Sequence, residues 1–492
     1  MGIGAKDPRV APLSEVGVVH TELKEGELGL FDSVAVATAS VAPAYSLTST
    51  IAFVVAIGGI GFGAPSILLV SFVVVLTIAF AYYFMNRKDP NCGASYSWLA
   101  RTVSPYFGWF NGWVQVLAST LFCASAPILA GANTLAFLNN IGWISAKAAN
   151  SVYWQAGIGL IWLVIITAMC VYGIRLTTDF QWVLVAIEYT AVIAFSVFAI
   201  LDVIASHPTG SVSFSWGWLN PFSIKGISAL AAGLVLGVFF FWGWDTSANL
   251  NEETKDANET PGRAGVISMF LLLVVFVLAA IAIQMRVPQK TIVNQGGSVL
   301  YYFAHSISPS LSVIMLLAIL SSTVATAQTT LLPAARITYS MARDKVFPSL
   351  FGKISARFKT PAEGTIVLAA LSAIVIGITT FSSSANTVFG KLITDIGILV
   401  AFYYGVTGLS CAWAFRKVLA RSAGIFLLAG LFPAVGGAAL LWVGYEVIVT
   451  GGTSVAVPTL VVMAAGIPLV IVARLINKTG YFQQKTVAYE SQ

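Results

Sequence analysis

A carboxylate stands in the middle of an apolar run that is long enough to cross a membrane. The run 228–250 contains the sequence FWGWD at 241–245, in which a glycine lies between two indoles and an acid follows. A charged side chain at that depth costs roughly several kcal/mol unless it meets a partner or a cavity. Gly243 is free to leave helical geometry, so we predict a discontinuous helix at a binding site. The alternative is an intact, kinked helix with a buried, protonated Asp245.

Three roles are open to Asp245 within that discontinuous helix. It can cap the half-helix that starts after it, because an acid at that place accepts backbone N–H bonds and complements the helix dipole. It can contact a cationic group of a ligand, or it can take up and release a proton.

Aromatic side chains gather around the same acid, at Phe239, Phe241, Trp242 and Trp244. Ring faces attract cations, so these residues can form a wall of a cation-binding cavity. At most two of the four can point into one cavity, and we expect Phe241 and Trp242 to do so. The alternative is that these aromatic side chains only pack against other helices or face lipid.

A second carboxyl group, that of Glu188, lies well inside the apolar run 178–204. An isolated carboxyl group in such surroundings stays protonated unless it is paired, which makes Glu188 a candidate carrier of a proton. A neutral glutamate that is hydrogen-bonded between helices is the alternative.

The composition of the chain is that of a membrane protein. Of its 492 residues, 58% are hydrophobic and 9% are charged, whereas a soluble domain carries roughly 25% charged residues. The net charge of +6 does not indicate nucleic-acid binding, because the basic residues lie in short loops. Four scattered cysteines and three histidines without ligand-like spacing predict neither a disulfide framework nor a metal site, and no cofactor is expected. Residues 1–29 lack the apolar core of a cleaved signal peptide.

Twelve apolar runs are long enough to serve as transmembrane helices, since a crossing takes about 20 residues. The runs are 30–55, 64–86, 105–137, 154–172, 178–204, 228–250, 264–285, 311–342, 362–381, 389–415, 424–448 and 455–475. The sequence therefore predicts an all-α polytopic membrane protein with both ends of the chain on one side.

The basic residues orient these twelve spans. Lys and Arg are enriched in cytoplasmic loops, and 21 of the 26 fall on the side of the two chain ends. The exceptions are Lys147, Lys225, Arg286, Lys290 and Lys391. We therefore expect the N- and C-termini to be cytoplasmic.

The first span carries its own helix-breaking signal. Pro43 removes a backbone donor and clashes with the preceding turn, so a break is expected within 40–44, with Pro43 in the first turn of the second half-helix. The alternative reading of the small residues there is close helix packing alone.

Two interrupted helices, the first and the sixth, begin five spans apart. Inverted five-helix repeats place broken helices at matching positions, with the binding site between them at the bilayer midplane. We therefore expect repeats at 30–204 and 228–415, followed by helices 11 and 12 at 424–475. The segments 1–29 and 476–492 are expected to be cytoplasmic tails.

Three motifs resemble those of the amino acid–polyamine–organocation (APC) superfamily of permeases. The stretch 90–113 matches P-x-x-G-[GAS]-x-Y-x-[WY]-x-x-R followed by G-[FW]-x-x-G-W. Residues 239–264 resemble F-x-F-x-G-[FY]-[ED] followed by an acidic tail, and 335–344 resemble R-x-x-Y-x-[ML]-[AS]-R-[DE]. The motifs occur in the family's order and cover most of the chain.

The resemblance implies a LeuT-type fold that works by alternating access. Members of the superfamily move amino acids, polyamines or related amines, coupled to protons or in exchange, and hold the substrate at the breaks of helices 1 and 6. The implied substrate-binding residues here are Ser40, Val41, Ala42, Pro43, Ala44, Tyr45, Phe241, Trp242, Gly243 and Asp245. Ser322 and Thr323 fall where sodium-coupled members of the fold place a cation, although such hydroxyls also commonly bond their own helix.

The sequence departs from the family pattern at the first break. The usual G-[ST]-G-I-F is absent, and SVAPAYS stands at 40–46. A segment without glycine, and with a proline that has no N–H, offers fewer donors to a substrate carboxylate. This departure favours an amine, or an amino acid held in a different pose.

Together these patterns predict a secondary active transporter, a permease of amino acids or related amines, in the inner (cytoplasmic) membrane. Proton symport is the expected mechanism, and the protein is expected to act as a monomer or homodimer. Coupling to Na+, antiport of substrate against product, and a transporter-like nutrient sensor are the alternatives. An enzyme is not expected, because no Ser–His, zinc or paired-carboxylate pattern occurs at a common depth. A channel would need a charged ring or a carbonyl filter.

Overall fold

The computed structural model describes residues 23–382, 385–477 and 479–489. Most of the predicted N-terminal tail and the last three residues therefore lie outside the described residues. The described chain is helical throughout, and its β-pairing is limited to an isolated bridge between Leu28 and Thr254.

Eleven helices of the described chain are long and apolar enough to cross a membrane, and Ile227–Phe240 is a shorter apolar helix between the fifth and sixth of them. Together they match the twelve predicted spans in order and position. The prediction of an all-α polytopic membrane protein is confirmed.

The first five spans are built from eight helices, because two of the spans carry additional short helices at their ends and the first is divided. These helices are α1 (Leu30–Val41), α2 (Pro43–Ala56), α3 (Ala64–Lys88), α4 (Ser95–Thr102), α5 (Pro105–Asn140), α6 (Ala146–Ala149), α7 (Val152–Tyr172) and α8 (Ile174–Ser206). Two single 3-10 turns, Trp216–Leu219 and Pro221–Ser223, lead into the second half.

The next five spans again begin with a divided helix. Their helices are α9 (Ile227–Phe240), α10 (Thr246–Asn249), α11 (Thr260–Arg286), α12 (Gln289–Gln295), α13 (Val299–Ile307), α14 (Ser312–Arg343), α15 (Ala362–Ser382) and α16 (Ala385–Ala414). The chain then adds α17 (Ala423–Ile425), α18 (Phe432–Thr450), α19 (Thr453–Ala464) and α20 (Gly466–Ile476).

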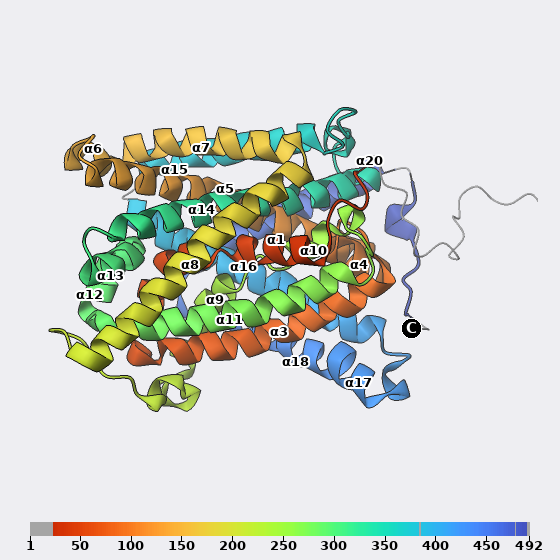
Figure 1. Ribbon diagram of the computed structural model, residues 1–492. Coiled ribbons are helices and arrows are strands. Elements are labelled where there is room, and N and C mark those ends of the chain that lie inside the picture. Colours follow the sequence, from red (N-terminus) through yellow and green to blue (C-terminus); the bar gives the residue numbers. More distant parts are fainter. Residues whose placement is uncertain (1–22, 383–384, 478, 490–492) are drawn as a thin grey trace, which may run out of the picture.

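The divided first span and α14 form the centre of the helix assembly. In the most apolar part of each, 89% of the α1–α2 residues and 78% of the α14 residues are buried, against 11% for α19–α20. Figure 1 shows α1 near the middle of the molecule, with α5 and α14 on one side and α3 and α11 on the other. The small and hydroxyl residues of the first span are therefore at the core, whereas α19–α20 presents its apolar surface outward, as a lipid-facing helix does.

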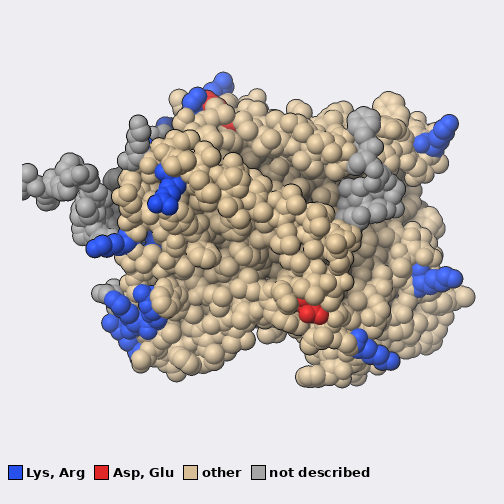
Figure 2. Space-filling model, turned by 180° about the vertical axis from the view of Figure 1, so that it is seen from behind, with Lys and Arg blue, Asp and Glu red and all other residues tan. Residues whose placement is uncertain are grey.

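Both described ends of the chain lie at one end of the molecule. Leu28 bridges Thr254, and the Val487 N–H donates to the Arg101 carbonyl. We call this the terminal end; the opposite end carries α6, α12 and α13 (Figure 1). In Figure 2 the Lys and Arg side chains gather toward these two ends, and the broad belt between them is almost entirely uncharged.

Candidate functional site

The first span breaks where the sequence predicts. Helix α1 ends at Val41, Ala42 takes a left-handed conformation (φ 50°), and Pro43 begins α2. Pro43 suits this place because its missing N–H would have no partner in the first turn. A left-handed alanine costs about 1–2 kcal/mol, so the surrounding helices must hold the break in place.

The sixth span breaks at the predicted glycine. Helix α9 ends at Phe240, and Gly243 has φ +118°, a conformation that side chains rarely adopt. A Cβ at Gly243 would lie 2.7 Å from the Ser40 Oγ and 2.9 Å from the Ser40 carbonyl carbon and oxygen. The two interruptions therefore touch each other directly, and the predicted discontinuity of helices 1 and 6 is confirmed.

The variant Gly243→Ala is expected to unfold at a lower temperature than wild type and to lose transport. Both the backbone conformation and the contact with Ser40 oppose a side chain, at a combined cost of about 2 kcal/mol or more. Thermal melting of the purified protein measures this change. The matched control is Gly157→Ala in α7, where a Cβ meets no heavy atom within 4 Å. If Gly243→Ala and Gly157→Ala had the same melting temperature, the break would not require the positive φ of Gly243.

Hydroxyl groups tie the two interruptions to α14. The Thr326 hydroxyl donates to the Ser40 carbonyl (2.5 Å), and the Thr246 hydroxyl lies 3.2 Å from the Thr329 carbonyl oxygen, to which it donates. The Ser40 and Thr246 hydroxyls are also hydrogen-bonded to each other (3.0 Å). Helix α14 thus holds both breaks in register.

Asp245 is buried at this junction and is surrounded by tyrosine hydroxyls. Its carboxylate accepts hydrogen bonds from Tyr404 (2.8 Å), Tyr403 (3.2 Å) and Tyr82 (3.4 Å). Although Asp245 directly precedes α10, its side chain makes no capping hydrogen bond to that helix. The capping role is therefore wrong: α10 is a single turn, and three hydroxyl donors on α3 and α16 solvate the carboxylate instead.

A small cavity lies beside Asp245, between the two interruptions. Of the predicted substrate-binding residues, Ser40, Trp242, Gly243 and Asp245 line it. The Trp242 indole N–H donates to the Tyr403 hydroxyl (2.5 Å), which links the aromatic wall to the tyrosines around Asp245. The cavity also has polar lining residues beyond those predicted from the sequence, which are Gln115, Ser119, Thr246, Asn249, Thr330 and Tyr403.

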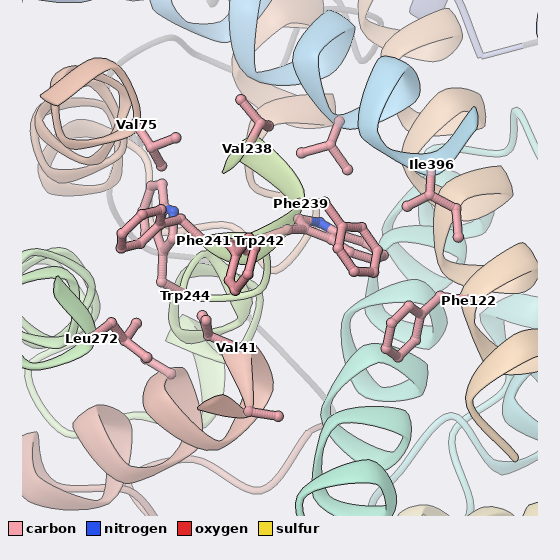
Figure 3. Close-up of a cluster of buried hydrophobic side chains, with 14 of the residues drawn as sticks. Val41, Val75, Phe122, Val238, Phe239, Phe241, Trp242, Trp244, Leu272 and Ile396 are labelled. Atoms are coloured by element: carbon pink, nitrogen blue, oxygen red, sulfur yellow. The ribbon is translucent and has the colours of Figure 1, made fainter. Parts of the chain in front are cut away.

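The aromatic residues divide between the two sides of the broken segment. Trp242 packs edge-on against Phe122, with ring centroids 5.3 Å apart, and Phe122 is 6.2 Å from Phe239. The expectation that Phe241 lines the cavity is wrong, because its ring packs against Phe276 (5.2 Å) and Phe72 (6.1 Å) on α11 and α3. Figure 3 shows Phe241 and Trp244 beside Val75 and Leu272, away from Phe122.

The remaining residues predicted at the first break do not line the cavity. The Tyr45 ring packs edge-on against Phe122 (5.3 Å), and the backbone N–H of Tyr45 donates to the Ser322 Oγ (2.9 Å). Val41, Ala42, Pro43 and Ala44 are buried in the protein core around the break. The backbone of these four residues forms the interruption, and their side chains do not line the cavity.

Glu188 lies at the same break, on the side of α8. It is fully buried, and the Ser322 hydroxyl and the Ala44 N–H face its carboxyl group, although neither contact reaches hydrogen-bond geometry. The Thr323 hydroxyl donates to the Ile319 carbonyl of its own helix (2.6 Å). Glu188 and Ser322 therefore meet at the start of α2, whereas Thr323 is engaged elsewhere.

Ion pairs join the segments at the terminal end. Arg336 of α14 forms two hydrogen bonds with Glu253 (2.7 and 2.9 Å), and both side chains are 1% exposed. Arg343 pairs in the same way with Glu252. Burial raises the pKa of Asp89, and Arg101, which is paired with it at this end, opposes that shift. The Arg336–Glu253 and Arg343–Glu252 pairs tie the segment that follows α10 to α14.

Sequence reasoning missed the three tyrosines around Asp245. They belong to α3 and α16, about 160 residues away in the chain, and each pairs with the acid only through the fold. The signal available was a tyrosine pair, Tyr403–Tyr404, in the middle of an apolar span. A buried phenol needs a hydrogen-bond partner, so such a pair opposite a broken helix indicates a polar site.

Curated relatives of the chain are transport proteins. The chain is 23% identical to the low-affinity putrescine importer PlaP of Escherichia coli (strain K12), over 72% of this chain and 74% of that protein. It is 24% identical to the branched-chain amino acid permease BcaP of Lactococcus lactis, over 68% of this chain and 70% of that protein. It is also 23% identical to the methylthioribose transporter of Bacillus subtilis, over 69% of this chain and 72% of that protein.

The match to a family model covers nearly the whole helix assembly. Residues 28–473 match the family described as amino acid permease, a span that starts before α1 and ends within α20. It includes both interrupted helices, the Asp245 cavity and all twelve spans. The chain belongs to the amino acid permease family and is a membrane transporter rather than an enzyme.

Proposed function

We propose that the protein is a secondary active transporter that carries an amino acid or a related amine across the cytoplasmic membrane by alternating access. The observation that carries this proposal is the meeting of two interrupted helices at a cavity that is lined by the buried carboxylate of Asp245. Irregular backbone at membrane depth is tolerated where it lines such a cavity. The names of the relatives, which include a putrescine importer and an amino acid permease, support the substrate class.

Two inverted repeats, 30–204 and 228–415, move against each other in this proposal. The divided spans α1–α2 and α9–α10 stand at the start of each repeat, as matching elements would. The terminal end faces the cytoplasm, because it carries most of the Lys and Arg residues. The cavity beside Asp245 then opens alternately to the two sides of the membrane.

Glu188 is the proposed carrier of the coupling proton. Its carboxyl group is fully buried at the start of α2, next to Ser322 and the Ala44 N–H. A charge there interacts with the N-terminus of α2, whereas a protonated group does not, so binding of a proton alters how the break is held. Proton binding and movement of the broken helix are linked in this way.

Uptake into proteoliposomes tests the proposal. A panel of labelled amino acids and amines is offered to vesicles with an acid exterior, and separately to preloaded vesicles without a gradient. We expect accumulation driven by the pH gradient. Transport only against internal substrate would indicate antiport, a requirement for external Na+ would indicate sodium coupling, and no transport of any compound would contradict the proposal.

The variant Glu188→Gln is expected to lose gradient-driven accumulation and to keep substrate exchange in preloaded vesicles. Glutamine keeps the size of the side chain but cannot bind and release the proton, so only the coupled process stops. The matched control is Glu446→Gln in α18, where a carboxyl group accepts a hydrogen bond from Ser228 far from the break. Undiminished accumulation by Glu188→Gln would exclude Glu188 as the proton carrier.

A further inference from the structure

We propose that the cavity beside Asp245 takes an organic amine without a carboxylate group, such as a primary monoamine or diamine, in preference to the corresponding amino acid. This inference rests on the proposed function and narrows its substrate class. Three features of the site carry it: the small number of free donors at the first break, the sign of the charge in the cavity, and the orientation of two amide side chains.

The N-terminus of α2 has few donors left for a substrate carboxylate. A helix N-terminus binds an anion through its unpaired N–H groups. Here Pro43 has no N–H, and the Ala44 N–H faces the Glu188 carboxyl group. The other N–H groups already donate to the protein. The Ala42 N–H donates to the Thr38 carbonyl (3.0 Å), the Tyr45 N–H to the Ser322 Oγ (2.9 Å) and the Ser46 N–H to the Ala42 carbonyl (2.9 Å). Of these groups, the Ala44 N–H is therefore the one donor left for a substrate carboxylate, and it lies beside the carboxyl group of Glu188.

The charge of the cavity also disfavours a carboxylate. Asp245 lines it, and its lining residues in the described chain include no Lys, Arg or His. The Asp245 carboxyl group is buried and solvated by three tyrosine hydroxyls, which suits a carboxylate that awaits a cation. An amino acid would bring its own carboxylate into the same small space, with no cation to compensate it.

Two amide side chains in the lining keep their acceptor oxygens for a ligand. The Asn249 amide nitrogen donates to the Cys92 carbonyl (2.9 Å), and the Gln115 amide nitrogen donates to the Asn111 carbonyl (3.3 Å). Each amide nitrogen thus has one N–H engaged with the protein, and each side-chain oxygen remains to accept a hydrogen bond at the cavity. Ammonium groups donate and carboxylates only accept, so the two oxygens complement an amine. Trp242 adds an aromatic face that attracts cations.

Matched pairs of compounds that differ by one carboxylate test the inference on the purified full-length protein. Putrescine is compared with ornithine, cadaverine with lysine, and isopentylamine with leucine, by competition against the labelled compound that binds best. We expect each amine to bind at least about tenfold more tightly than its amino acid, because an unpaired like charge in the cavity is costly. Lysinamide, which lacks the negative charge but keeps a group at that position, is expected to bind more tightly than lysine.

The outcomes separate this inference from the proposed function. Equal or tighter binding of the amino acids would overturn the amine preference while leaving an amino acid permease. Lysinamide that binds no better than lysine would show that size, and not the carboxylate charge, decides, and would also overturn the inference. Absence of binding and transport for every pair would instead overturn the proposed function.

Discussion

The variant Asp245→Asn is expected to lower the affinity for an amine by about a hundredfold, because truncating a buried charge pair costs about 2–5 kcal/mol. Asparagine fits the same space and can still accept the hydroxyl of Tyr404, so the loss should come from the charge rather than from misfolding. Competition binding measures the affinity, and thermal melting of the same sample measures the fold.

The chain offers a matched control for this substitution. Asp395 lies in α16, outside the cavity lining, and accepts a hydrogen bond from the Thr459 hydroxyl (2.8 Å). We expect Asp395→Asn to bind amine as the wild type does. Unchanged affinity in Asp245→Asn, with or without lower stability, would mean that the carboxylate does not contact the substrate.

The second large effect is expected at the terminal end of the molecule. The variant Arg336→Met leaves Glu253 buried without its partner, and breaking a buried ion pair in this way costs about 3–5 kcal/mol. The double variant Glu253→Gln/Arg336→Met removes both charges and is expected to recover part of that loss. Thermal melting in detergent compares the two variants with the wild type.

The expected effect is large because Arg336 and Glu253 are buried, so an exposed arginine serves as the control. Arg175 pairs with Asp179 at 3.0 Å, but both side chains are about half exposed. The same change there, Arg175→Met, is expected to cost no more than about 1 kcal/mol. If Arg336→Met melted no lower than Arg175→Met, the buried pair would not hold the segment after α10 against α14.

The spans and their interruptions were accessible from the sequence because each has a local cause. Apolar length alone identifies a crossing, and Pro43 and Gly243 mark the breaks, since one lacks an N–H and the other tolerates a positive φ. Asp245 and Glu188 stood out because carboxyl groups are rare in apolar runs. These features need no knowledge of neighbouring helices.

The directions of side chains at the sixth break were not accessible in the same way. Helical periodicity relates neighbouring positions only while the helix continues, and α9 ends at Phe240. Phe241 therefore turns toward α3 and α11, and Trp242 faces the cavity. Similarly, an acid before a helix ordinarily caps that helix, but the Asp245 carboxylate accepts hydrogen bonds from three tyrosines of distant spans instead. Such partners are set by tertiary packing.

The most direct measurement is an experimental structure of the full-length protein in a lipid nanodisc with a bound amine, such as putrescine. We expect the ammonium nitrogen about 3 Å from the Asp245 carboxylate, between the α1–α2 and α9–α10 interruptions and beside Trp242. An amine bound elsewhere, with the cavity at Asp245 unoccupied at saturating concentration, would contradict the assignment of this junction as the substrate site.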